Sequence, residues 1–119
     1  MKKNVVKEKS FEFALLVVET YKLLVNDKRE FVMSKQFLRS GTAVGALVRE
    51  AEHAESKKDF IHKLAIALKE ANETEYWLSL MHQSGYLNES EKGKLEKEIA
   101  ELLRLLIAII KSTKQNLQK

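Results

Sequence analysis

The chain has 119 residues, of which 45% are hydrophobic and 32% are charged, and its formal net charge is +4. It contains no cysteine, which excludes a disulfide scaffold, a thiolate zinc site and a cysteine nucleophile. It contains no proline and only four glycines, so the residues that commonly form the turns of β-rich folds are scarce. A chain of this length holds one hydrophobic core, and we expect a single all-α domain over residues 1–119.

The first predicted helix begins at Ser10, a residue type that caps helix N-termini, and runs to about Asn26. Residues 1–9 would then form a basic N-terminal tail. Its charged residues are Lys2, Lys3, Lys7, Glu8 and Lys9. Such a terminus is usually a solvated segment, and its alternative role is an arm that contacts nucleic acid.

Three further helices are predicted in chain order. The second, over residues 34–55, follows a polar connection and begins at a serine that can cap it. The third, over residues 56–84, opens with S-K-K-D, which resembles a capping box, and ends before Gly85. The fourth, over residues 88–115, opens with N-E-S-E, whose acidic side chains suit the positive end of the helix dipole. Short connections make neighbouring helices antiparallel, which predicts an up-down-up-down four-helix bundle.

The second predicted helix contains many small residues, including Gly41 and Gly45. A glycine inside a helix costs about 1 kcal/mol relative to alanine, so two of them suggest a packing reason. Close approach of a neighbouring helix is one explanation. The alternative is that Gly41 marks a kink or a helix start.

Neither a secretory signal nor a membrane span is predicted. The apolar segment 11–18 is interrupted by Glu12 and lacks a small-residue cleavage site. The longest unbroken apolar runs, 13–18 and 105–110, have six residues each, whereas a membrane span needs about 20. We therefore expect a cytoplasmic protein.

The predicted helices carry more apolar surface than a monomeric bundle of this size needs. The first helix is apolar nearly all round, and apolar residues of the third lie roughly 100–160° from the centre of its core stripe. Four helices cannot bury all of these faces, so the surplus should meet other subunits, with Trp77 as the strongest anchor. The candidate interface residues are Phe13, Leu16, Ile66, Trp77 and Leu80.

No catalytic motif stands out in the chain, and we expect neither an enzyme nor a cofactor. Glu50 and His53 have the E-x-x-H spacing of di-iron bundles. Asp59 and His62 have the same spacing with aspartate in place of glutamate, which is a weaker match. Glu50 and His53 fall opposite the apolar stripe of their helix, so they should point outward, and no metal site is expected.

Two polar residues fall near the core stripe of the third predicted helix. His82 is expected to be a hydrogen-bonded structural histidine. Glu75 either pairs with a cation, for which Arg49 is available, or is solvated at the edge of the stripe. An Arg49–Glu75 pair would set the register of the second helix against the third.

Five basic residues are candidates for phosphate contacts, because they cluster around the second helix and the start of the third. They are Arg39, Arg49, Lys57, Lys58 and Lys63. Acidic residues are interleaved with them, so the cluster is no basic stripe, and a solvated face is the alternative. In a ring-shaped oligomer each cation would be copied around the axis, which strengthens a modest patch.

One long stretch of the chain carries a family resemblance. It contains L-R-S-G-T-A-V-G-A at 38–46, R-E-A-E at 49–52 and A-E-S-K-K-D-F-I-H-K-L at 54–64, and it continues as I-A-L-K-E-A-N-E-T-E-Y-W-L at 66–78. It resembles the bacterial four-helix-bundle family named after proteins encoded in intervening sequences of large-subunit ribosomal RNA genes. This family includes relatives of the accessory variability protein of diversity-generating retroelements.

The resemblance implies a homopentameric barrel without enzymatic activity. In the accessory variability relatives it also implies a basic surface that binds nucleic acid and a reverse transcriptase. Ala43 and Leu47 stand where the family pattern has serine and asparagine, so a role of those polar groups is in doubt for this chain.

Two functional hypotheses follow from the sequence. The first is a non-enzymatic oligomer that associates with RNA or DNA through weakly sequence-specific phosphate contacts. The alternative is an assembly or scaffold module that docks a partner protein, such as a reverse transcriptase, without touching nucleic acid. Salt separates them, because phosphate binding weakens steeply with salt and apolar docking does not.

Overall fold

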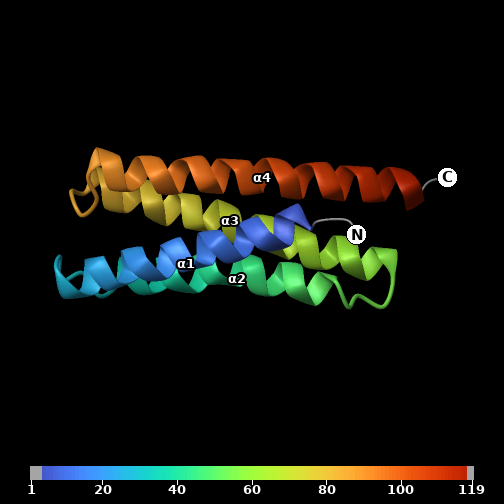
Figure 1. Ribbon diagram of the computed structural model, residues 1–119, viewed down its shortest axis with the longest axis horizontal. Helices are drawn as coiled ribbons and strands as arrows, with labels where there is room; N and C mark the ends of the chain where they lie inside the picture. The colour runs from blue at the N-terminus through green and yellow to red at the C-terminus, as the bar shows by residue number, and fades with distance from the viewer. Residues whose placement is uncertain (1–3, 118–119) are drawn as a thin grey trace.

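The computed structural model describes residues 4–117 and forms four α-helices there (Figure 1). They are α1 (Val5–Asn26), α2 (Met33–Ala51), α3 (Lys57–Gln83) and α4 (Glu89–Leu117). Each helix runs antiparallel to the next, and α1 packs against both α2 and α4 while α3 packs against α2 and α4. The bundle measures 51 × 26 × 21 Å. The predicted up-down-up-down four-helix bundle is confirmed for this range.

The core is one continuous cluster with contributions from all four helices. The apolar faces of α3 and α4 point inward. Their buried members include Leu64, Leu78, Leu95, Ile99 and Leu102. The prediction for α1 needs a correction, because its apolar residues are not equivalent. Phe13 is 1% exposed and packs in the core of its own chain, so it is not part of the surface that a second subunit could contact.

The start of α1 lies earlier than predicted. The side-chain oxygen of Asn4 accepts a hydrogen bond from the backbone N–H of Lys7 at 3.1 Å, so Asn4 is the N-cap. Ser10 is buried inside the helix instead, where its hydroxyl donates to the backbone oxygen of Lys7. Residues 5–9 are therefore helical rather than part of a tail, and residues 1–3 lie outside the described range.

The start of α2 depends on Glu30, which sequence reasoning assigned to a connection. Its carboxylate accepts hydrogen bonds from the backbone N–H groups of Val32 and Met33 at 3.2 Å and of Ser34 at 2.7 Å. The predicted cap, Ser34, lies within the first turn of α2 and donates its own hydroxyl to the backbone oxygen of Glu30. A carboxylate at this end also suits the positive pole of the helix dipole.

The predicted starts of α3 and α4 are confirmed. The Ser56 hydroxyl accepts from the backbone N–H of Asp59 at 3.0 Å. Asn88 and Glu91 cap each other reciprocally at 2.8 and 2.9 Å. Gly85, just past the end of α3, has a φ of 92°, the left-handed conformation that favours glycine there.

The glycines of α2 allow it to approach α1 closely. A Cβ atom on Gly41 would lie 2.8 Å from a methyl carbon of Val17, and one on Gly45 would lie 3.2 Å from the backbone oxygen of Ser10. Both glycines lie inside the continuous helix α2, so the packing explanation holds and Gly41 is not a helix start.

The contact of α2 with α3 contains a buried polar link. The hydroxyl oxygens of Ser40 and Thr74 are 2.8 Å apart, and neither side chain is exposed. This link fixes the register of the two helices, because a shift of one residue would leave two buried hydroxyls without each other. The Arg49–Glu75 pair, one of the two alternatives considered for Glu75, does not fill that role, since Arg49 lies over the ring of Phe11 on α1.

Candidate nucleic-acid interface

Arg39, the first of the five predicted phosphate contacts, is engaged within the bundle. Its guanidinium lies 2.8 Å from the carboxylate of Glu70 and also binds that of Glu73. The indole N–H of Trp77 donates to the same Glu73 carboxylate at 3.1 Å. The Trp77 indole and the Arg39 guanidinium together hold the pKa of Glu73 below its usual range. Arg39 thus joins α2 to α3 with its charge balanced locally.

Lys63 is also paired inside the molecule. Its ammonium lies 3.1 Å from the carboxylate of Glu50, which connects α3 to α2. Lysines of the predicted tail behave in the same way. Lys7 lies 3.2 Å from Glu52, the residue that follows α2, and Lys9 lies 2.9 Å from Glu101 of α4.

The other three predicted cations are exposed and have no carboxylate partner within residues 4–117. Lys57 and Lys58 form the first turn of α3. The Arg49 guanidinium lies 5.3 Å from the centroid of the Phe11 ring. The structure therefore separates the five candidates into Arg39 and Lys63, which are neutralised, and three cations that remain available to phosphates.

Other exposed lysines and arginines without a carboxylate partner occur along residues 4–117, and two of them, at the end of α4, are cations that sequence reasoning missed. Lys111 and Lys114 are exposed on the last turns of α4, and no acidic residue follows Glu101 in the chain. Figure 1 places the end of α4 at the same end of the bundle as the start of α3. We call this cluster the basic end. Its members are Arg49, Lys57, Lys58, Lys111 and Lys114.

The signal for the two missed lysines was present in the sequence. A long acid-free segment closes the fourth helix, and antiparallel pairing brings the end of that helix to the start of the third. The basic end also contains carboxylates, because Glu55 and Asp59 flank the start of α3. The local field is therefore positive without being uniformly so.

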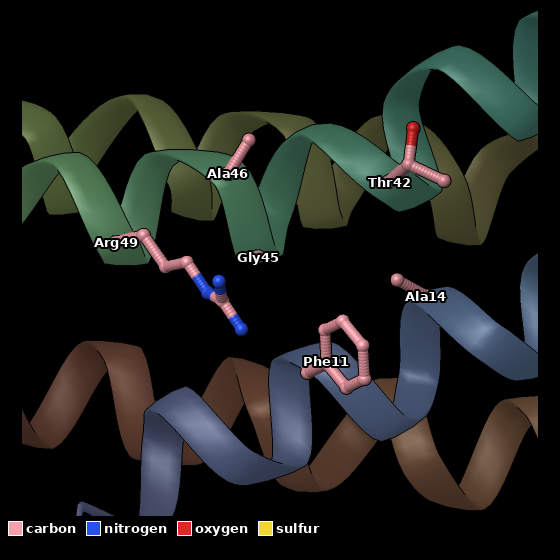
Figure 2. Close-up of a pocket in the computed structure, with 6 residues that line it drawn as sticks. All are labelled: Phe11, Ala14, Thr42, Gly45, Ala46 and Arg49. Atoms are coloured by element: carbon pink, nitrogen blue, oxygen red, sulfur yellow. The ribbon is translucent and has the colours of Figure 1, made fainter.

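A groove opens between α1 and α2 beside the basic end (Figure 2). It has a volume of about 250 Å³. Small side chains leave it unfilled, and the Phe11 ring from α1 and the Arg49 guanidinium from α2 point into it. Its lining residues are Phe11, Ala14, Thr42, Gly45, Ala46 and Arg49.

The remaining candidate interface residues lie at or near the surface. Leu80 is 38% exposed, and Leu16, Ile66 and Trp77 are half-buried. The exposed ring of Tyr76 meets Trp77 edge-on, with 5.0 Å between their centroids. Of these residues, Ile66, Tyr76, Trp77 and Leu80 belong to α3 and present an apolar outer face there, whereas Leu16 belongs to α1.

The E-x-x-H residues point away from the core, as predicted. Glu50 and His53 are both exposed. No group of three or more His, Cys, Asp or Glu residues that could hold a metal ion occurs among residues 4–117. The half-buried His82, expected to be a structural histidine, has its Nε2 atom 2.9 Å from the carboxylate of Glu89. No helix in the described range is long and apolar enough to cross a membrane.

The fold and the surface define an all-helical four-helix-bundle protein with a basic end and an apolar outer face on α3. The chain belongs to the 23S rRNA-intervening sequence protein family, whose model matches residues 2–108. It is also similar to a solved protein of unknown function from the S23 ribosomal protein family of Bacteroides thetaiotaomicron VPI-5482. That similarity has 57% identity and a TM-score of 0.88, and it covers 89% of this chain and 98% of the other. The comparison with curated proteins finds no match.

Proposed function

We propose that this protein is a non-enzymatic oligomer that associates with nucleic acid by weakly sequence-specific phosphate contacts. The observation that carries the proposal is the basic end, where five exposed cations from three helices have no carboxylate partner in the described chain. Lysines at a helix end position a phosphate backbone without reading bases. The experiment below separates this role from the docking of a partner protein.

Binding to a single-stranded RNA oligonucleotide should weaken steeply as salt rises. Each phosphate contact contributes about 0.7 to the slope of log affinity against log salt for single strands. The double variant Lys57→Ala/Lys58→Ala should therefore lower that slope by about 1.4. The matched control is Arg39→Ala, because the charge of Arg39 is already balanced by Glu70 and Glu73. Fluorescence anisotropy at several salt concentrations measures both.

Two outcomes would contradict the role of the basic end. If deletion of residues 1–3 abolishes binding and the double variant does not, the terminus binds instead. If the intact protein shows no salt-sensitive binding to single- or double-stranded RNA or DNA, the function is to dock a partner protein, such as a reverse transcriptase.

The assembly is the second part of the proposal. The apolar outer face of α3 and the family resemblance both support a homopentamer, so light scattering should report about five times the chain mass of 13.7 kDa. Leu80→Glu should reduce the mass of the particle while helicity by circular dichroism is retained. Its control is Ile107→Glu, which changes an exposed residue of α4. A monomer at micromolar concentration would contradict the assembly.

A further inference from the structure

The groove between α1 and α2 contains an exposed aromatic ring and an exposed guanidinium that lies over it. The Phe11 ring is 50% exposed, although burial of an aromatic ring is among the larger favourable contributions that a side chain makes. Arg49 has no carboxylate partner in residues 4–117, and its guanidinium lies 5.3 Å from the centroid of that ring. Figure 2 shows both side chains entering the groove from opposite helices.

The dimensions of the groove limit what it can hold. Its volume of about 250 Å³ is below the roughly 300–1,000 Å³ of pockets that enclose a drug-sized ligand. Ala14 and Ala46 are too small to fill the space, and Gly45 has no side chain. An occupant of this volume is one small group, and the ring and the guanidinium favour a flat group with a negative charge.

We propose that this groove binds one unpaired nucleotide of a single-stranded nucleic acid, with its base stacked on Phe11 and its phosphate on Arg49. This inference rests on the function proposed above and adds a site that accepts a base. Aromatic side chains stack on every base, and arginine binds phosphate with a planar fork of donors. Charge complementarity supports the occupant, since the groove presents a cation and no carboxylate among its lining residues.

The position of Arg49 links the groove to the basic end. Arg49 lies in the last turns of α2, and the short connection from α2 leads directly to Lys57 and Lys58. A strand whose base occupies the groove can therefore continue with its next phosphates over the start of α3. Stacking is tolerant of sequence, in agreement with the weak sequence specificity proposed for the protein.

The test compares Phe11 with a second aromatic residue in the same local geometry. Arg29 lies 5.3 Å from the centroid of the Phe31 ring, and Phe31 is 51% exposed and does not line the groove. Phe31 belongs to the connection between α1 and α2, which Figure 1 shows at the end of the bundle opposite the start of α3. Phe11→Leu and Phe31→Leu each remove one exposed ring and keep an apolar side chain. The probes are a fluorescein-labelled ten-nucleotide oligouridylate, its DNA counterpart oligothymidylate, and an RNA duplex, each titrated with the full chain.

Phe11→Leu should weaken binding of the single strands about tenfold, within the range of about 5- to 150-fold expected for losing one stacked base. Binding of the duplex should stay within twofold, because a paired base cannot enter the groove. Phe31→Leu should bind all three probes like the intact protein. Phe11→Tyr, which keeps a ring, should retain single-strand binding. A 2-aminopurine base placed in the oligonucleotide should be quenched by the intact protein and not by Phe11→Leu.

Several results would overturn the site. If Phe11→Leu binds single strands as tightly as the intact protein while Lys57→Ala/Lys58→Ala binds them weakly, the groove is wrong and the proposed function stands. If Phe11→Leu weakens the duplex as much as the single strand, or changes the particle mass in light scattering, the ring supports assembly rather than stacking. If the intact protein binds none of the probes, the proposed function and this site both fail.

Discussion

Replacement of Phe13 by alanine is expected to lower the free energy of unfolding by about 3–5 kcal/mol, the usual cost of deleting a large side chain from a core. Phe13 is one of the largest fully buried side chains of the bundle. The cavity left behind would be lined by residues that already pack at full density, so it would collapse only in part. Urea unfolding followed by circular dichroism, at one fixed protein concentration, measures the change.

Phe11→Ala is the matched control for this prediction. It removes the same side chain two residues earlier on the same helix, where the ring is half exposed. Its effect on the free energy of unfolding should be within about 0.5 kcal/mol, as for other surface positions. Equal losses at the two positions would show that the burial difference between Phe11 and Phe13 does not hold in solution.

Replacement of Glu30 by glutamine is expected to lower the free energy of unfolding by about 1–3 kcal/mol at neutral pH. Glu30 is 7% exposed, and its carboxylate accepts hydrogen bonds from three backbone N–H groups at the start of α2. Charge-assisted hydrogen bonds are stronger than neutral ones, and loss of a helix cap costs about 0.5–2 kcal/mol. The control is Glu19→Gln, which changes an exposed carboxylate of α1 and should leave stability within about 0.5 kcal/mol.

The contribution of Glu30 should also depend on pH. Burial opposes ionisation of its carboxyl group, but the hydrogen bonds from three backbone N–H groups outweigh it and hold the pKa below its ordinary value. A depressed folded pKa stabilises the fold above the unfolded value of about 4.3, and this stabilisation is lost as the pH falls through the folded value. The difference in unfolding free energy between the intact protein and Glu30→Gln should therefore be largest at neutral pH and shrink below about pH 4.3. A difference that is constant from pH 7 to pH 3 would contradict the ionised cap.

The bundle itself could be predicted from the sequence, because its determinants are local. The caps at Ser56 and Asn88, the left-handed Gly85 and the apolar stripes of α3 and α4 each depend on residues within a few positions of one another. Where two residues near a helix start could each cap it, the predicted cap was the wrong one. Ser10 and Ser34 are good cap residues by type, yet Asn4 and Glu30 hold the two helix starts.

The candidate site could be predicted only in part, because charge on its own does not say which cations are paired. Lys57 and Lys58 remain available, whereas Lys63, five residues later, meets Glu50 across a helix contact. Helical periodicity did not show that Phe13 is buried and Phe11 exposed. The first helix is apolar nearly all round, so its pattern does not indicate which face points to the core.

By itself, the sequence determined the number of helices, their antiparallel order and the caps at Ser56, Gly85 and Asn88, since these follow from short-range backbone chemistry and from the periodicity of apolar residues. Only the tertiary structure decided which arginine is balanced by Glu70 and Glu73, which phenylalanine is buried and where a groove stays open. The physical reason is that burial and ion pairing depend on contacts between residues far apart in the chain. Those contacts exist only after the helices have packed.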